Sequence, residues 1–122
     1  MQLTKNFHLS EFHCKDGTQV PFNLACNVIQ LASALQIIRD TIKQPLYINS
    51  AYRTPEHNKK VKGAKNSYHL KAMAADLSSK TFTPFKLFTF IDELINNKKI
   101  PQGGLFIYPG FVHYDIRGFK AR

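Results

Sequence analysis

The sequence predicts an α+β fold in which helices flank a small, mainly antiparallel sheet. Two stretches with helical spacing of apolar residues and four short strand-like stretches support this fold class. These elements do not alternate as regular βαβ units, which argues against a parallel sheet. With 122 residues, of which 43% are hydrophobic and 20% charged, the chain fits one globular domain over residues 1–122.

The first predicted helix spans Asn27–Lys43, where apolar residues recur at helical spacing above a polar opposite face. These residues are Val28, Leu31, Ala32, Leu35, Ile38 and Ile42. Pro45 ends the helix, and Leu46–Ser50 alternates like a short strand. A Thr-Pro pair at positions 54–55 supplies a helix cap and a first helical residue, so we expect a short helix from there to about Val61.

The second half of the chain carries the remaining elements. They are a loop over 62–67, a strand at Ala74–Leu77, a helix that begins at Thr83-Pro84, and two strands, Leu105–Tyr108 and Phe111–Ile116, joined by a Pro109-Gly110 turn. The helix is predicted from apolar residues at helical spacing, namely Phe85, Leu87, Phe88, Ile91, Leu94 and Ile95. Gly103-Gly104 breaks the chain before the two strands, and the Pro-Gly turn makes a hairpin of them.

The charge balance is strongly basic, because 17 Lys and Arg residues against 8 Asp and Glu residues give a net charge of +9. Such a charge favours anionic partners: nucleic acid, an anionic membrane surface, or an acidic polymer such as a bacterial wall. The densest cluster, Lys59, Lys60, Lys62 and Lys65, is too short for a nucleic-acid-binding tail and is equally typical of a solvated loop. No recognition helix or aromatic-basic sheet motif is present, so we predict no nucleic-acid binding. The apolar runs are too short for a membrane span.

Two cysteines are too few for a disulfide framework. Cys26 follows Leu24 and Ala25, and we predict that it is a small buried residue. A bridge between Cys14 and Cys26 is the alternative. The N-terminal MQLTKNFHLSEF contains no signal peptide, so we expect synthesis in the cytoplasm.

A metal site is the chemistry that the residue types favour most. Asp76 lies in the apolar run MAADL, where a carboxylate is costly to bury unless it is paired or coordinated. His69 precedes it by seven residues, and His113 lies in the predicted strand FVHYDIR. Two His and one Asp match a catalytic zinc site, which keeps its fourth position open for water. For the other histidines we expect solvation or local hydrogen bonds: His8, His13 and His57.

Zinc hydrolysis also needs a general base and a positive group for the developing oxyanion. Asp115 shares the face of His113 if the segment is a strand, because residues two apart point the same way. It is therefore a candidate base, with a salt bridge to Arg117 or Arg53 as the alternative. Arg53, which follows one predicted strand, is the candidate for the oxyanion, with a simple surface cation as the alternative.

Four motifs follow one another along the chain. They are Ser50–Asn58 (SAYRTPEHN), Gly63–His69 (GAKNSYH), Ala74–Asp76 (AAD), and Gly103-Gly104 followed by Tyr108 and Phe111–Gly118 (FVHYDIRG). This ordered set resembles the M15 peptidase family of zinc D-Ala-D-Ala carboxypeptidases and L-Ala-D-Glu endopeptidases, which cut peptidoglycan stem peptides. The resemblance is strongest to the short single-domain branch found in phages and bacteria, and with the N-terminal FHLSEF it extends over nearly the whole chain.

The resemblance implies a role for each matching residue. His69, Asp76 and His113 would bind one Zn²⁺ ion. Arg53 would polarise the scissile carbonyl and stabilise the oxyanion, and Ser67 would hydrogen-bond the substrate. The family fold, a small antiparallel sheet with flanking helices, agrees with the fold class predicted above.

One position departs from the carboxypeptidase pattern, in which an acid three residues before the last His ligand is the general base. Gly110 occupies that position here and cannot accept a proton. The short branch resembles the His113-x-Asp115 arrangement, so Asp115 is the predicted base or its substitute. A carboxylate that only orients His113 would give the same sequence pattern.

The expected function is hydrolysis of an amide bond in peptidoglycan stem peptides by attack of a zinc-activated water. The enzyme would act at the cell wall, after lysis or as a component of a phage virion. The alternative is a catalytically degenerate module that keeps zinc and binds the wall or serves as a virion structural part; the glycine at position 110 motivates it.

Overall fold

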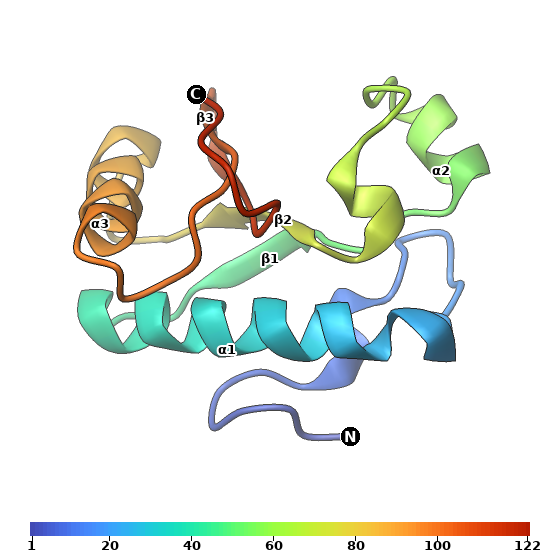
Figure 1. Ribbon diagram of the computed structural model, residues 1–122, viewed down its shortest axis with the longest axis horizontal. Coiled ribbons are helices and arrows are strands. Elements are labelled where there is room, and N and C mark those ends of the chain that lie inside the picture. The colour runs from blue at the N-terminus through green and yellow to red at the C-terminus, as the bar shows by residue number, and fades with distance from the viewer.

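The computed structural model describes all of residues 1–122 (Figure 1). Its elements, in chain order, are η1 (Leu9–Phe12), η2 (Phe22–Leu24), α1 (Ala25–Ile42), β1 (Tyr47–Ser50), α2 (Pro55–Lys60), η3 (Tyr68–Lys71), β2 (Ala74–Ser78), α3 (Pro84–Asn96), β3 (Leu105–Tyr108) and β4 (Phe111–Asp115), where η denotes a 3₁₀ helix. The predicted helices and strands are confirmed within about two residues at each end. The three 3₁₀ helices were not predicted, because segments of three or four residues carry no periodic pattern.

The four strands form one antiparallel sheet in the order β1-β2-β4-β3, so the predicted α+β fold is confirmed. A single row of opposed residues crosses all four strands. Ser50 on β1 faces Asp76 on β2, Asp76 faces His113 on β4, and His113 faces Phe106 on β3. This register places residues that lie far apart in the sequence side by side on one face of the sheet.

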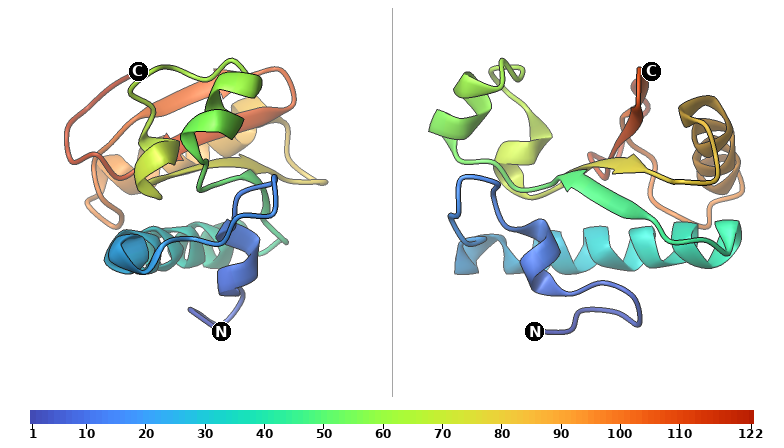
Figure 2. Two further views of the ribbon diagram at one scale, coloured as in Figure 1. Left: turned by 90° about the vertical axis from the view of Figure 1, so that its right-hand side faces the viewer. Right: turned by 180° about the vertical axis from the view of Figure 1, so that it is seen from behind.

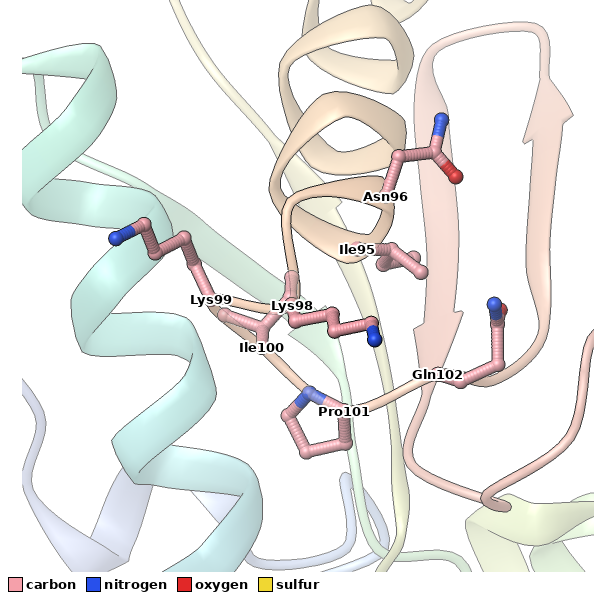
Figure 3. Close-up of a pocket in the computed structure, with 7 residues that line it drawn as sticks. All are labelled: Ile95, Asn96, Lys98, Lys99, Ile100, Pro101 and Gln102. Carbon is pink, nitrogen blue, oxygen red and sulfur yellow. The ribbon is translucent and has the colours of Figure 1, made fainter.

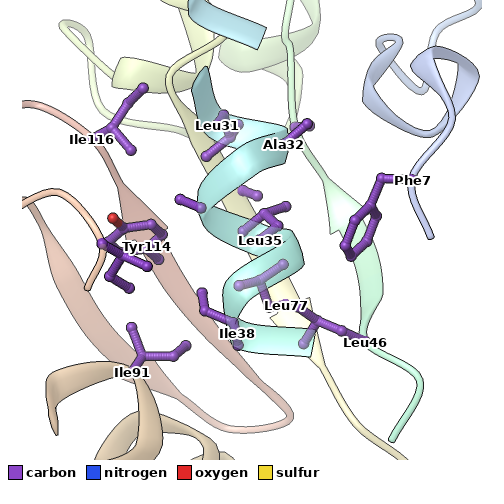
Figure 4. Close-up of a cluster of buried hydrophobic side chains, with 14 of the residues drawn as sticks. Phe7, Leu31, Ala32, Leu35, Ile38, Leu46, Leu77, Ile91, Tyr114 and Ile116 are labelled. Carbon is purple, nitrogen blue, oxygen red and sulfur yellow. The ribbon is translucent and has the colours of Figure 1, made fainter. Parts of the chain in front are cut away.

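The opposite face of the sheet is buried beneath helices. Figures 1 and 2 show α1 running across this face and α3 at its β3–β4 side. Figure 4 shows Leu31, Leu35 and Ile38 of α1 directed toward Leu77 of β2 and Tyr114 of β4. Because side chains alternate along a strand, burial of Leu77 and Tyr114 turns their neighbours Asp76 and His113 to the other face.

Both capped helices begin as predicted. The hydroxyl of Thr54 accepts a hydrogen bond from the His57 amide at 3.1 Å, and that of Thr83 accepts one from the Lys86 amide at 3.2 Å. A proline follows each cap, where its missing N–H costs nothing. The cap on α2 matters for the site, because it fixes the residue that directly follows Arg53.

The two cysteines are free, and the prediction for Cys26 is wrong. Cys26 is exposed in the first turn of α1, whereas Cys14 is buried. Residues two apart in a helix point to roughly opposite sides. Because Val28 is buried, Cys26, two residues before it, faces outward. Cys14 is buried because the N-terminal segment packs against β1 and the loop after it, where the Tyr52 amide donates to the Phe12 carbonyl.

No helix of the structure combines the length and the apolar character that crossing a membrane requires.

Neighbouring isoleucines of α1 provide a matched test of the core. Ile38 is fully buried, whereas Ile37 is 38% exposed. We expect Ile38→Ala to lower the free energy of unfolding by about 2–5 kcal/mol, because it leaves a cavity against the sheet. Ile37→Ala should cost less than about 1 kcal/mol, because the side chain that it removes is partly exposed. The two variants are matched, since both change helix propensity in the same way. Urea denaturation measures both, and equal losses would contradict the placement of α1.

Candidate metal centre

Three donor atoms converge where the row of opposed residues crosses β2 and β4. His69 Nε2 lies 3.2 Å from Asp76 Oδ1, and His113 Nδ1 lies 3.1 Å from the same oxygen. Ligands around a four-coordinate zinc ion at ordinary bond lengths stand roughly 3.3 Å apart. The spacing of these three atoms therefore fits one small cation between them.

The backbone carbonyl of Ala51 sets the tautomer of His69. Its Nδ1 lies 2.6 Å from the Ala51 carbonyl oxygen, and a carbonyl can only accept, so Nδ1 carries the proton. The free lone pair of His69 is then on Nε2, which faces Asp76. The side chain is 3% exposed, and Ser67 caps the 3₁₀ helix that holds it.

His113 is oriented in the same way from the other side. Its Nε2 lies 2.8 Å from Asp115 Oδ2, which accepts the proton of that nitrogen. The lone pair on Nδ1 is thereby directed at Asp76. Two nitrogen lone pairs and a carboxylate oxygen at hydrogen-bonding distance repel one another unless a proton or a cation lies between them. This donor set fits a metal ion, and imidazole with carboxylate suits Zn²⁺.

Protons can take the place of a cation between these atoms. Burial favours the neutral form of Asp76, but hydrogen bonds from protonated His113 and His69 outweigh burial and hold the pKa of Asp76 well below its usual range. Burial also opposes protonation of His113, yet its hydrogen bonds to Asp115 and Asp76 raise the pKa of this imidazole. The site therefore favours positive charge beside an ionised Asp76.

Arg53 holds the second oxygen of the same carboxylate. Its Nη2 donates to Asp76 Oδ2 at 3.0 Å, its Nε to Ser50 Oγ at 3.0 Å, and its Nη1 to Asn58 Oδ1 at 3.2 Å. A guanidinium has five N–H donors, so two remain free. Arg53 is thus a rigidly held cation beside the donor atoms, and the alternative of a free surface cation does not apply.

The donor atoms lie at one side of an open cavity of about 690 Å³. Basic side chains and aromatic rings dominate its lining: Arg53, Lys62, Lys65, Arg117, Tyr68, Phe106, Tyr108 and Phe111. Ser67 also lines it; the Ser67 hydroxyl oxygen accepts from the His69 amide, which leaves the hydroxyl proton available to a ligand. Asp76 is the only carboxylate residue in the lining, so the cavity is suited to an anionic ligand.

Asp115 does not reach this cavity. It is fully buried, and Oδ1 accepts from the Gly104 amide at 2.9 Å and from Nε of Arg117 at 2.9 Å, while Oδ2 accepts from His113 and from Nη2 of Arg117. The salt bridge to Arg117, an alternative expected from the sequence, is present. Burial favours the neutral acid, but Arg117 and His113 hold the pKa of Asp115 well below its usual range. A general base must lie within hydrogen-bonding reach of the water that it deprotonates, directly or through one further water, whereas both oxygens of Asp115 are occupied by these donors and the residue does not line the cavity.

Glycine is required at position 104, beside Asp115, and is favoured at position 110, in the hairpin turn. A Cβ on Gly104 would lie 2.3 Å from Asp115 Oδ2, so only glycine lets this backbone approach and donate to the carboxylate. Gly110 occupies the hairpin turn with φ +90°, a conformation that disfavours an acidic side chain. The turn geometry is therefore a physical reason for the glycine at the position where the carboxypeptidase pattern has an acid.

Sequence reasoning gave Asn58 no role and named Arg117 only as an alternative salt-bridge partner of Asp115. Asn58 is buried and joins Arg53 to the Ala64 carbonyl, which its amide group reaches at 2.9 Å. Arg117 pairs with Asp115 and stacks over the Tyr68 ring at 4.4 Å. Both residues stand in the quoted motifs, but only tertiary structure shows the contacts of Asn58 and the stacking of Arg117 on Tyr68.

A second cavity, of about 530 Å³, lies beyond the end of α3 (Figure 3). Its lining is Ile95, Asn96, Lys98, Lys99, Ile100, Pro101 and Gln102. It contains no histidine, cysteine or carboxylate, so it offers neither a metal site nor an acid-base pair.

Comparison with known proteins agrees with the geometry. The chain matches the family model described as Peptidase M15 over residues 5–115. Among curated proteins no match is found. M15 peptidases are zinc enzymes, and the structure brings together side chains that can hold a metal ion. Since the match spans nearly its whole length, the chain belongs to the peptidase M15 family.

Proposed function

We propose that this protein is a zinc-dependent peptidase that hydrolyses an amide bond in peptidoglycan stem peptides, as a D-Ala-D-Ala carboxypeptidase or an endopeptidase. The observation that carries the proposal is the convergence of three lone pairs, from His69, Asp76 and His113, at the side of a basic cavity. These residues would hold one Zn²⁺ ion. When bound, such an ion supplies a Lewis acid that polarises a carbonyl and makes water a nucleophile near neutral pH.

Arg53 supplies the positive group for the reaction. Its bonds to Ser50, Asn58 and Asp76 fix the guanidinium before any substrate arrives. Its two free N–H groups can donate to the carbonyl oxygen as negative charge develops there. Preorganised donors of this kind stabilise the transition state without reorganisation during the reaction.

The substrate is expected to be anionic. Lys62, Lys65, Arg117 and Arg53 line the cavity, and no carboxylate other than Asp76 opposes them. Ser67 adds a hydroxyl donor at the same wall. A stem peptide carries carboxylate groups that these donors can bind, and the net charge of +9 supports residence on an anionic wall. We propose that the protein reaches that wall in one of two ways, by release at lysis or as a component of a phage virion.

For Asp115 we infer a positioning role in place of the base role expected from the sequence. Arg117 and Gly104 fix the carboxylate, and the carboxylate fixes the His113 ring with its lone pair toward Asp76. Partners of this kind set the tautomer and the basicity of a ligand histidine.

A second candidate function follows from the lining of the cavity. No free carboxylate stands beside the donor atoms to take a proton from water. This favours a module that keeps zinc and binds wall peptides without cutting them. Cleavage assays separate the two functions.

Loss of one donor residue tests whether the site is catalytic. With zinc supplied, the wild type should release cleavage products from a panel of muropeptides, and His113→Ala should release none, because it removes one donor of three. His8→Ala, far from the cavity, is the matched control and should stay active. Chromatography of the products measures all three. Stoichiometric zinc with no cleavage across the panel would favour the binding module.

Removal of the guanidinium tests the role of Arg53. Arg53→Ala should lower kcat by roughly 10²–10³-fold, the usual effect of losing an oxyanion donor. Arg39→Ala, on α1 away from the cavity, should leave kcat unchanged. Steady-state kinetics on the best muropeptide measure the effect. A rise in KM with kcat unchanged would instead make Arg53 a residue that only binds the substrate.

Asp115→Asn separates orientation from base catalysis. If Asp115 orients His113, the variant should bind zinc about 10–100-fold more weakly and regain most of its activity at saturating zinc. Asp92→Asn, which breaks an exposed pair with Arg122, should change neither quantity. Competition with a chromophoric chelator gives the affinities. Unchanged zinc affinity together with lost turnover would restore Asp115 as the base.

A further inference from the structure

A second cluster of metal-binding side chains lies outside the central cavity. Cys14, Asp16 and His57 place one donor atom each within 4.8 Å of one another. Cys14 and Asp16 belong to the N-terminal segment, and His57 lies in the first turns of α2. In the right-hand view of Figure 2 the N-terminal loop rises to meet α2. The cluster therefore joins two segments that are some forty residues apart in the sequence.

Cys14 has both apolar and polar neighbours. Its side chain is buried in the hydrophobic core, and its sulfur lies 4.0 Å from the Thr54 hydroxyl oxygen. The same hydroxyl donates to Asp16 Oδ2 at 2.8 Å. Thiolate sulfur is a metal ligand, and the sulfur of Cys14 lies where it can meet a carboxylate oxygen of Asp16 and a ring nitrogen of His57.

The carboxylate of Asp16 is held in place at this cluster. Its Oδ1 accepts from the Thr18 amide at 2.8 Å, and its Oδ2 accepts from the Thr54 hydroxyl. A carboxylate oxygen is therefore fixed beside the Cys14 sulfur and the His57 ring.

We propose that Cys14, Asp16 and His57 form a second metal site, which takes a borderline-soft divalent cation such as Zn²⁺. Thiolate and imidazole together select such ions over Mg²⁺ or Ca²⁺. Donors around a four-coordinate zinc ion stand roughly 3.3–3.8 Å apart, so the cluster closes with small side-chain movements. Asp16 is exposed, which leaves an open side for entry of the ion and for water as fourth ligand.

The position of this site gives it a structural role. His57 belongs to α2, and Thr54, the cap of this helix, directly follows Arg53. Asn58, also of α2, accepts a hydrogen bond from Arg53 Nη1. An ion that joins the N-terminal loop to α2 would hold the wall of the cavity that carries Arg53. The protein would then bind two ions, one in each site.

Metal-free full-length protein titrated with Co²⁺ tests the proposal, because cobalt bound to thiolate has a charge-transfer band in the near ultraviolet. Equilibrium dialysis counts the ions. The wild type should bind two ions per chain and show the band. Cys14→Ser should bind one ion and lose the band, and His57→Gln, at a half-buried position, should lose the same ion. The matched control, Cys26→Ser, should keep both ions and the band.

His113→Ala keeps the two sites distinguishable. It should lose the central ion and retain the thiolate band, and circular dichroism should show each variant folded. One ion in the wild type without the band, unchanged in Cys14→Ser and lost in His113→Ala, would overturn the second site and leave the proposed function standing. A band that persists in Cys14→Ser would also overturn it, since the thiolate would then belong to Cys26.

Discussion

The carboxylate of Asp76 is the group around which the site is arranged. Its Oδ1 faces the two histidines, and its Oδ2 accepts from Arg53. A charge buried this far, with 9% of the side chain exposed, is tolerated only when it is paired and hydrogen-bonded. The Ala51 carbonyl, the Asp115 carboxylate and the Ser50 hydroxyl orient His69, His113 and Arg53 respectively. All three side chains are thereby directed at the one carboxylate of Asp76.

Much of this arrangement could be predicted from the sequence. The periodicity of α1 and α3 and the Thr-Pro caps located the helices, because local rules decide those features. The apolar run around Asp76 signalled a carboxylate that needs a partner. The alternation of β4 placed His113 and Asp115 on one face, and their 2.8 Å contact agrees with it.

Other features depend on tertiary packing and left no local signal. Asp115 is closed off from the cavity by Arg117 and the backbone at Gly104, which no strand pattern reports. Cys26 stands in an apolar stretch, yet the helix turns it outward, while Cys14 is buried by a segment without regular structure. His57 meets Cys14 and Asp16 only because the N-terminal loop folds back onto α2.

The row of opposed residues across the sheet also bears on how the chain reaches its native pairing. A shift of β2 by one residue against β4 would turn Asp76 into the core and Leu77 into the cavity. The donor atoms would then no longer meet, so a cation can bind only the correctly paired sheet. Ligands that bind the native state alone stabilise it by mass action. A cation held by the proposed site would thus stabilise the correct alignment of β2 and β4 over a shifted one.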